Sequence, residues 1–410
     1  MKEIIKNKII AISGEPVSGK GTVVKELVEQ LRKSGYEEEN IHVISTGKEF
    51  RDYFKEIIKF IIKTNNSENL EEFKKNEKIK QILENREYRK ALIETIDKAK
   101  KEKIDLIKLD IADINESQLF SELRKVVDYL IDNDMKKTGE NINKEKREND
   151  IWIIDSRMAF YNVPDAFSVR LTANPKIAAQ RLYNDNTRGE EDRYNSIEEA
   201  EKEREDRRIS EIKRYKRRYN VDLEDEDNYD LIIDTSYSSI EDITNTILEC
   251  EKCYEEGKNF GKTWTSPLTM IPCQKFMETV SIGLGSKYSL DGLRDEILKK
   301  GFLPDKEIEI FKIDGINYIL EGHHRNFASI LAGKTLIPYI DLMKTKEGKE
   351  IYRKGRYPTT TKSKLYDHED FVERNLREQK NDEKLKFSYS QIYPNILEEI
   401  KKDISFSRFD

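Results

Sequence analysis

Short apolar runs recur along the first 250 residues, separated by longer charged segments in which apolar residues recur at three- and four-residue spacing. Short runs of this kind predict buried strands, and the periodic segments between them predict amphipathic helices. Strands that alternate with helices indicate an α/β fold with a parallel sheet. Five strands are predicted, at residues 9–12, 41–45, 151–154, 167–172 and 229–234.

Residues 52–150 form a long, highly charged stretch with helical periodicity. Polar clusters at residues 65–69 and 138–143 predict breaks between its helices. We interpret most of its charges as solvated helix faces. The stretch from about residue 55 to residue 150 is therefore predicted to be a helical insertion.

The pattern changes after residue 255, where a polar stretch with glycines at 256–263 predicts a linker. Apolar runs at 308–312 and 318–320 around Asp314-Gly315 predict a hairpin, followed by a helix through Ala332 and a strand at 337–340. We therefore predict a first domain at 1–255 and a smaller α+β domain with a helical extension at 264–410.

Composition narrows the classes of partner. The 410 residues carry a formal net charge of −6, and 38% of them are charged. A net negative charge does not favour a nucleic acid or an anionic membrane as partner. The sequence has no run of about 18 apolar residues, as a membrane span requires, and no apolar segment near Met1 that would suggest secretion. We expect a cytoplasmic protein, and the sequence favours no particular oligomeric state.

The chain contains three cysteines. Cys250 and Cys253 form one CxxC pair on a predicted helix at 240–256, without a second pair at metal-binding spacing. A structural role is favoured for both over a metal or redox site. Cys273 has no partner in the sequence pattern.

The most specific motif is GEPVSGKGT at residues 14–22, directly after the first predicted strand. Gly14 and Gly19 bracket a tight loop whose backbone N–H groups can surround phosphate oxygens. Lys20 can reach the β- and γ-phosphates, and the hydroxyl of Thr22 is placed for Mg²⁺. The motif predicts ATP binding by Gly14, Ser18, Gly19, Lys20, Gly21 and Thr22, with a chance glycine turn as the alternative.

Polar residues follow the next two predicted strands. Thr46 and Arg51 come after residues 41–45, and Asp155 and Arg157 come after residues 151–154. Ligands of open α/β sheets bind at the carboxyl ends of strands, and an arginine fork suits a phosphate. These residues are candidates for the monophosphate site, and for Arg51 an ordinary exposed helix residue is the alternative. The Asp155 carboxylate can order Mg²⁺-bound water or accept a hydrogen bond from the substrate, and Arg157 can hold a phosphate or a base edge.

Arginines are also frequent between residues 181 and 217. Arg181 lies on a predicted helix, and Arg188 and Arg193 lie in a polar segment. Arg207 and Arg214 are two helical turns apart and so share one face of a helix at about 196–219, where they can stabilise a phosphoryl group during transfer. For Lys202, Arg204, Lys213 and Arg217, exposed i,i+4 charge pairs are the preferred interpretation.

A second cluster, EGHHR, spans residues 321–325 at the predicted strand-to-helix junction. His323, His324, Arg325 and the helix N-terminus favour an anion site, with Gly322 allowing the turn. Glu321 is a candidate metal ligand or base. The alternative is that one histidine packs under the hairpin.

Residues 8–250 resemble a cytidylate kinase, a nucleoside monophosphate kinase of the P-loop type. The matching motifs are GEPVSGKGT (14–22), STGKEFR (45–51), IIDSR (153–157), FSVRLTANPKIAAQR (167–181), RRISEIKRY (207–215) and YDLIIDTS (229–236). The resemblance implies a three-layer α/β/α fold with a helical lid and catalytic roles for Lys20, Arg157, Arg207 and Arg214. It also implies a monophosphate site with Thr46, Arg51, Asp155, Arg157 and Arg181. Asp155 departs from the family's usual glutamate.

Residues 308–341 resemble the ParB/sulfiredoxin superfamily, and most of all its free-serine-kinase-like branch, whose motif is (D/E)GHHR. The resemblance implies that the histidines and Arg325 hold phosphates and that Glu321 supports catalysis. Residues 264–275 are expected to form another wall of the pocket.

Three hypotheses follow. The first is an ATP- and Mg²⁺-dependent kinase that phosphorylates a nucleoside monophosphate, CMP or dCMP, with a fused nucleotide- or phosphometabolite-binding domain. The second places the chemistry at the EGHHR site, with a serine-like metabolite as acceptor. The third is a nucleotide-gated binding module without turnover.

Overall fold

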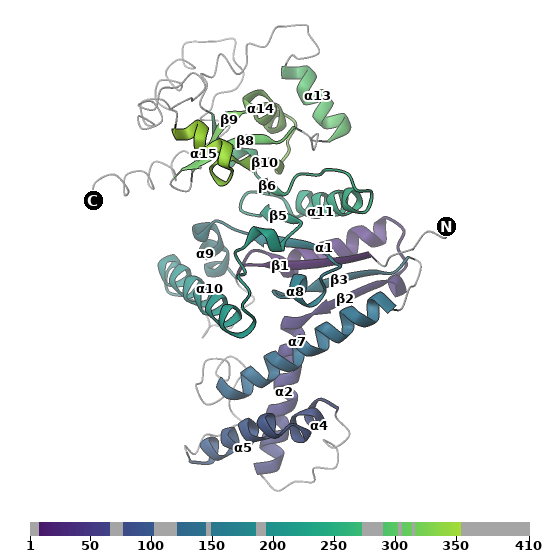
Figure 1. The fold of residues 1–410 in the computed structure, drawn as a ribbon, viewed down its shortest axis with the longest axis vertical. Coiled ribbons are helices and arrows are strands. Elements are labelled where there is room, and N and C mark those ends of the chain that lie inside the picture. Colours follow the sequence, from purple (N-terminus) through teal and green to yellow (C-terminus); the bar gives the residue numbers. More distant parts are fainter. Residues whose placement is uncertain are drawn as a thin grey trace, which may run out of the picture. The chain divides into compact units, whose positions relative to one another are not determined.

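The structure is a computed structural model that describes residues 8–65, 77–101, 121–144, 149–185, 194–272, 290–301, 306–313 and 316–353. The chain divides into two compact units, residues 1–13 with 31–168 and residues 14–30 with 169–410. Both units combine helices with a mostly parallel set of strands, as predicted for an α/β fold (Figure 1).

The first unit contains the predicted strands at 9–12, 41–45 and 151–154, and the structure confirms all three. They are β1 (Lys8–Gly14), β2 (Ile41–Ser45) and β3 (Ile151–Asp155). The strands are parallel in the order β2-β3-β1, and Ser45 lies opposite Asp155 in the register. Parallel pairing places the carboxyl ends of β2 and β3 together, so the polar residues that follow them become neighbours.

Helices make up the rest of this unit. They are α2 (Thr46–Asn65), α4 (Glu77–Glu84), α5 (Arg86–Lys101), α7 (Ser121–Lys144) and the short α8 (Ala159–Asn162). Figure 1 shows α7 crossing α2, with α4 and α5 near the far end of α2. One apolar core extends from Ile9 of β1 to Phe54 of α2 and Leu123 of α7. The described part of the predicted insertion is therefore helical and shares its core with the strands of the first unit.

The predicted break at residues 138–143 is wrong, because α7 continues unbroken to Lys144. Buried Met135 and Ile142 anchor its last turns in the core. Within this stretch Gly139 allows a close approach: a Cβ there would lie 2.9 Å from a Val163 methyl group. At the other predicted break, α2 ends at Asn65, and residues 66–69 lie outside the described residues.

The second unit begins with the helix that follows β1. It contains α1 (Lys20–Lys33), β4 (Phe167–Thr172), α9 (Pro175–Tyr183), α10 (Ile197–Tyr219), β5 (Leu231–Asp234) and α11 (Ile240–Glu255). Strands β4 and β5 are parallel. The side chains of Asn174, Ser196 and Ser239 cap the N-termini of α9, α10 and α11, which fixes where each helix starts.

The later part of this unit contains the predicted hairpin and the strand-to-helix junction, both confirmed. Its elements are β6 (Thr263–Thr265), β7 (Met270–Pro272), α13 (Leu290–Lys300), β8 (Ile308–Ile313), β9 (Ile316–Glu321), α14 (His323–Leu331), β10 (Ile337–Asp341) and α15 (Lys346–Arg353). Single 3₁₀ turns lie at η1 (Glu38–Asn40), η4 (Glu226–Asn228), η5 (Pro267–Thr269) and η6 (Leu342–Lys344).

Strand β6 connects the two parts of the second unit. It follows the predicted linker, runs parallel to β5 and pairs antiparallel with β10. The strand order is β4-β5-β6-β10-β8-β9-β7. The hydroxyl of Ser238 also donates to the carbonyl of Thr335, 2.9 Å away. The predicted domain boundary near residue 255 stays a prediction, and strand pairing continues beyond it.

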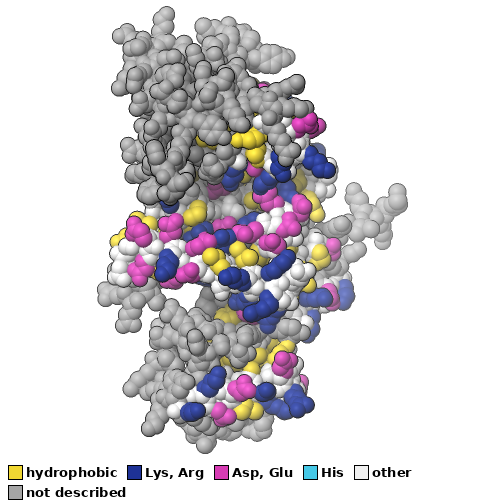
Figure 2. Space-filling model, turned by 60° about the vertical axis from the view of Figure 1, so that its left-hand side comes forward, with side chains coloured by type: hydrophobic (Ala, Val, Ile, Leu, Met, Phe, Trp, Pro, Cys, Tyr) yellow, Lys and Arg dark blue, Asp and Glu magenta, His cyan; other side chains and the backbone are white. Residues whose placement is uncertain are grey.

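The described surface is densely charged, as the composition implies. Figure 2 shows Lys and Arg side chains intermixed with Asp and Glu on the face that it presents. Across the described ranges, no helix has both the length and the apolarity needed to cross a membrane.

Candidate functional site

The predicted phosphate loop forms a tight turn between β1 and α1. A Cβ on Gly14 would lie 2.6 Å from the Ser18 hydroxyl oxygen and 2.8 Å from the Leu171 carbonyl oxygen, so only glycine fits there. Gly19 has a φ of +85°, in the left-handed region that glycine adopts without strain, and Val17 has a φ of +64°. The two bracketing glycines are therefore required by the shape of the turn.

The loop leads directly into the first turn of α1. The N–H of Ser18 donates to the Glu15 carbonyl at 3.2 Å, and the N–H of Val23 donates to the Gly19 carbonyl at 3.0 Å. A Cβ placed on Gly19 or Gly21 would meet nothing within 4 Å, and Thr22 is exposed. The start of α1 is thus open to solvent on the side where a helix N-terminus attracts an anion.

The turn after β5 is hydrogen-bonded to this loop. The hydroxyl of Thr235 lies 3.0 Å from the carbonyl oxygens of both Ser18 and Thr172, which share its one proton. Arg181 of α9 donates to the Thr235 carbonyl at 2.6 Å and to the Ser236 carbonyl at 3.3 Å, and burial lowers the pKa of its guanidinium. These contacts give Arg181 a role in positioning the turn, and its role as a monophosphate ligand stays a prediction.

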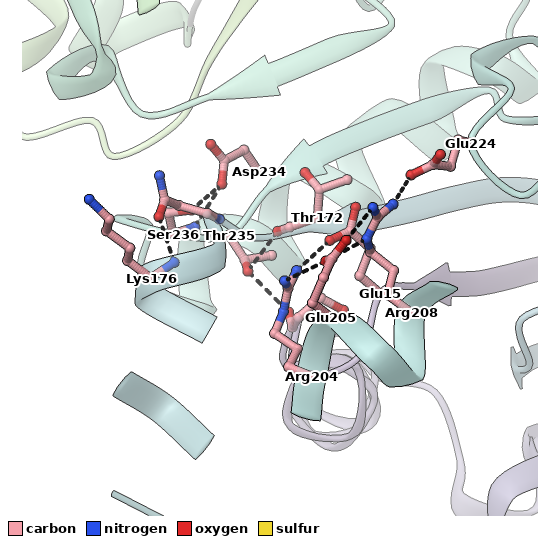
Figure 3. A network of polar contacts seen from close by, with 12 residues as sticks. Glu15, Thr172, Lys176, Arg204, Glu205, Arg208, Glu224, Asp234, Thr235 and Ser236 are labelled. Atoms are coloured by element: carbon pink, nitrogen blue, oxygen red, sulfur yellow. Dashed lines mark hydrogen bonds and ion pairs between the residues drawn. The ribbon is translucent and has the colours of Figure 1, made fainter. Parts of the chain in front are cut away.

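A buried ionic cluster around Glu15 was not foreseen. The carboxylate of Glu15 accepts from Arg204 Nη2 of α10 at 2.7 Å and from Arg170 Nη2 of β4 at 3.3 Å. Figure 3 shows the Arg204 guanidinium directed from α10 toward Glu15. Burial raises the pKa of the Glu15 carboxyl, and the opposing pull of the nearby arginines is smaller.

Arg204 is therefore the residue that sequence reasoning placed wrongly. Its side chain is 1% exposed, whereas it was interpreted as part of a solvated set of charge pairs. Lys202, Lys213 and Arg217, which shared that interpretation, are exposed as expected. The sequence signal that could have found the difference is weak, because Glu15 lies 189 positions away.

The two predicted lid arginines make contacts within their own helix. Arg207 is 58% exposed and its Nε donates to Glu211 Oε1 at 3.2 Å. Arg214 lies over the ring of Tyr215, with 4.9 Å from Cζ to the ring centroid. Their catalytic roles stay predictions, and Arg188 and Arg193 lie outside the described residues.

In the first unit, the structure brings together part of the predicted monophosphate site. The hydroxyl of Ser45 donates to Asp155 Oδ2 at 3.0 Å, and that of Thr46 donates to the Asp155 carbonyl at 3.2 Å. Arg157 follows in the turn after β3, where it is partly buried. Arg51 lies in α2, and its side chain lies outside the described part.

The EGHHR cluster connects β9 to α14 by a turn that is shorter than the one between β1 and α1. Gly322 has a φ of +102°, and a Cβ there would lie 2.7 Å from Ile308 Cδ1 and 3.2 Å from Arg325 Nη2. The helix α14 starts at the very next residue, His323. Arg325 turns back and donates to the Lys306 carbonyl. The guanidinium therefore covers the glycine and is bonded to the protein's own backbone.

The members of this cluster point in different directions. His323 is buried, and burial together with the neighbouring His324 lowers its pKa to about 4, so its imidazole is neutral at pH 7. Glu321 is exposed and lies opposite Glu309 in the β8–β9 register. Throughout the described ranges, no three His, Cys, Asp or Glu residues are grouped to bind a metal ion. The metal role of Glu321 stays a prediction.

The cysteine pair lies on α11, as predicted. Both thiols are free, and burial raises the pKa of the Cys250 thiol far above its usual range. A protonated, buried thiol behaves as a small apolar side chain, which agrees with a structural role. Cys273 lies outside the described residues.

Comparison with known proteins gives one distant relative. No family model matches the chain. A stretch of 197 residues, 47% of the chain, is 25% identical to an S-adenosylmethionine-dependent nucleotide dehydratase of Lacinutrix mariniflava. The aligned stretch covers 36% of that protein, so the chain spans about a third of the length of this relative.

Proposed function

We propose that the protein is an ATP-dependent phosphotransferase that transfers the γ-phosphate to a nucleoside monophosphate, with CMP and dCMP as the first acceptors to test. The observation that carries the proposal is the turn at residues 14–22. It combines a glycine that cannot be replaced, a left-handed glycine and a lysine at the open start of a helix. Such turns bind phosphate chains through backbone N–H groups and the helix dipole.

The polar group at Ser45, Thr46 and Asp155 supports a nucleotide as the acceptor. A carboxylate held by a neighbouring hydroxyl is fixed in orientation and can accept from a base or ribose. The distant relative is named for action on a nucleotide, which agrees with this class of substrate. The attacking group would be the acceptor's phosphate oxygen, which is already anionic, so no general base is required.

Mg²⁺ fits the residues present at the loop. The hydroxyl of Thr22 is exposed in the first turn of α1, and Mg²⁺ usually takes few protein ligands beside phosphates and water. When bound, the ion would neutralise negative charge on the phosphates. Lys20 would act on the same oxygens, and the contact from Thr235 to the Ser18 carbonyl keeps the loop in shape.

A second candidate places the chemistry at the EGHHR cluster. Its support is the Gly322 junction at the start of α14, next to an arginine and a neutral histidine. It is the weaker candidate because α14 starts directly after Gly322, without an open loop, and the Arg325 guanidinium lies against that glycine. A binding module without turnover is the third candidate.

A direct test is ³¹P NMR of the full chain with Mg·ATP and a panel of acceptors. The panel contains CMP, dCMP, UMP, AMP, GMP and serine with related hydroxy-metabolites. A nucleoside diphosphate together with ADP supports the proposal. A phosphomonoester of a metabolite moves the chemistry to the EGHHR cluster. ATP that is bound and left unchanged by every acceptor supports the binding module.

A further inference from the structure

The most buried part of the cluster around Glu15 contains more arginine than carboxylate side chains. The side chains of Arg204 and Arg170 are 1% and 10% exposed, and they share the single carboxylate of Glu15, which is 18% exposed. The neighbouring Arg208 has carboxylate partners of its own, because it donates to Glu205 and to Glu224 near the surface. The interior of the cluster therefore contains two guanidinium groups and one carboxylate.

Arg204 is also incompletely bonded. Its Nη2 donates to Glu15, whereas its Nε and Nη1 are buried and have no hydrogen-bond partner. Nη1 lies 3.8 Å from Glu205 Oε2, which is within ion-pair range and too long for a hydrogen bond. Buried donors without partners are costly, especially on a charged group, and such groups are usually completed by a ligand, an ion or water.

The position of these donors connects them to the phosphate loop. Glu15 directly follows Gly14, and the Ser18 hydroxyl in the same loop is also buried without a partner. Unsatisfied buried polar atoms thus belong both to the loop itself and to an arginine that is bonded to the loop residue Glu15. A phosphate chain supplies acceptor oxygens in the number and charge that such donors need.

We propose that Arg204 is a phosphate ligand whose remaining donors bind the phosphate chain of the nucleotide that occupies the loop. This inference rests on the proposed function, since it assumes that the loop binds ATP. Glu15 holds the guanidinium in place, and the buried positive excess favours an anion. Arg204 would therefore be a binding residue in addition to Lys20, on a part of α10 that the sequence pattern assigned to solvent.

Two variants distinguish this role from a merely structural one. If Arg204 only shapes the loop through Glu15, then Glu15→Gln and Arg204→Gln break the same contact and weaken binding alike. If Arg204 binds phosphate, then Arg204→Gln weakens binding about 10- to 100-fold, whereas Glu15→Gln leaves it equal or stronger. The removal of the Glu15 charge increases the positive excess beside the ligand.

The experiment is calorimetric titration of the full chain with Mg·ATP and, separately, with inorganic tripolyphosphate. Arg208→Gln is the matched control, since that arginine has carboxylate partners, and it should change affinity less than about threefold. Arg204→Lys, which keeps the buried charge and loses the planar guanidinium fork, replaces Arg204→Gln if melting curves show that the latter does not fold.

Opposite effects of Glu15→Gln and Arg204→Gln on both probes support the inference. Equal losses in the two variants, or an unchanged affinity in Arg204→Gln, overturn it and leave ATP binding by the wild type intact. A wild-type chain that binds neither probe overturns the proposed function itself.

Discussion

The turn at residues 14–22 and the turn at residues 321–325 both connect a strand to a helix through a glycine. They differ in the groups that lie beside the start of the helix. In both, a glycine whose position excludes a Cβ lies at the end of a strand or directly after it, and a helix begins soon after. In the first turn a loop separates Gly14 from α1, and Gly19 and Gly21 border open space. In the second turn α14 begins directly after Gly322, and Arg325 lies against that glycine.

The comparison teaches that similar residue types do not make equivalent sites. The first turn leaves the start of its helix open for a ligand, whereas the second directs its histidine inward and bonds its arginine to the Lys306 carbonyl. The Lys306 carbonyl occupies one nitrogen of the Arg325 guanidinium, so a ligand at the second turn would have to use the other donors. The predictions below test this difference, beginning with the largest expected effect.

Gly14→Ala should damage the first turn severely. Its Cβ would approach the Ser18 hydroxyl and the Leu171 carbonyl, and overpacking of this kind costs about 1–3 kcal/mol of unfolding free energy. ATP affinity should fall with it, because the loop must move. The measurement is urea unfolding together with ATP titration. Gly21→Ala, where the added methyl group meets nothing within 4 Å, is the control and should keep its stability. A tolerated Gly14→Ala would show that the turn is not tight.

His323 should make the second turn sensitive to acid. Because its pKa falls from 6.5 to about 4 on folding, the unfolded chain binds a proton that the folded chain does not. Stability therefore decreases as the pH falls from about 6.5 toward 4, with a loss from this group of about 2 kcal/mol between pH 7 and pH 5. Urea unfolding at the two pH values measures it. His323→Gln should remove this part of the pH dependence, and His324→Gln should retain most of it. Equal pH dependence in wild type and His323→Gln would contradict a buried, neutral imidazole.

Thr235→Val should weaken the contact between the turn after β5 and the turn at residues 14–22. The loss of the hydroxyl leaves the Ser18 carbonyl and one Arg181 donor without their partner, which costs about 1 kcal/mol and weakens ATP binding. Thr345→Val is matched in chemistry, because that hydroxyl donates to the Leu342 carbonyl away from the loop. It should cost similar stability and leave ATP affinity unchanged. If both variants alter ATP binding equally, the contact has no specific effect on the loop.

Arg207→Gln should have the smallest effect on stability. Its exposed pair with Glu211 lies on one helix, where such pairs contribute less than about 0.5 kcal/mol. A lid role predicts instead a loss of turnover without a loss of stability. Thermal melts and phosphotransfer rates on the same sample separate the two. A large drop in melting temperature would mean that Arg207 supports the fold.

Most strands and the first turn were predictable because their signals are local. An apolar run that ends at Gly14 or Asp155 identifies both a strand and the residues at its carboxyl end. The continuation of α7 past Gly139 was not predictable. A glycine among polar residues is typical of a helix break, and the contact with Val163 that explains this glycine is visible only in the structure. Arg204 was missed for the same reason, since its partner Glu15 is distant in the chain and its neighbours are solvated charges.

The most direct test of the account compares phosphotransfer by the full chain in three variants, with ³¹P NMR of Mg·ATP and CMP. Lys20→Ala should lower the rate of CDP formation about 100- to 1,000-fold, as expected when a charged phosphate ligand is removed from a transfer site. Lys25→Ala, an exposed lysine on the same helix, and Arg325→Ala should retain nearly the full rate. Turnover that survives Lys20→Ala and disappears in Arg325→Ala would contradict the account and place the chemistry at the second turn.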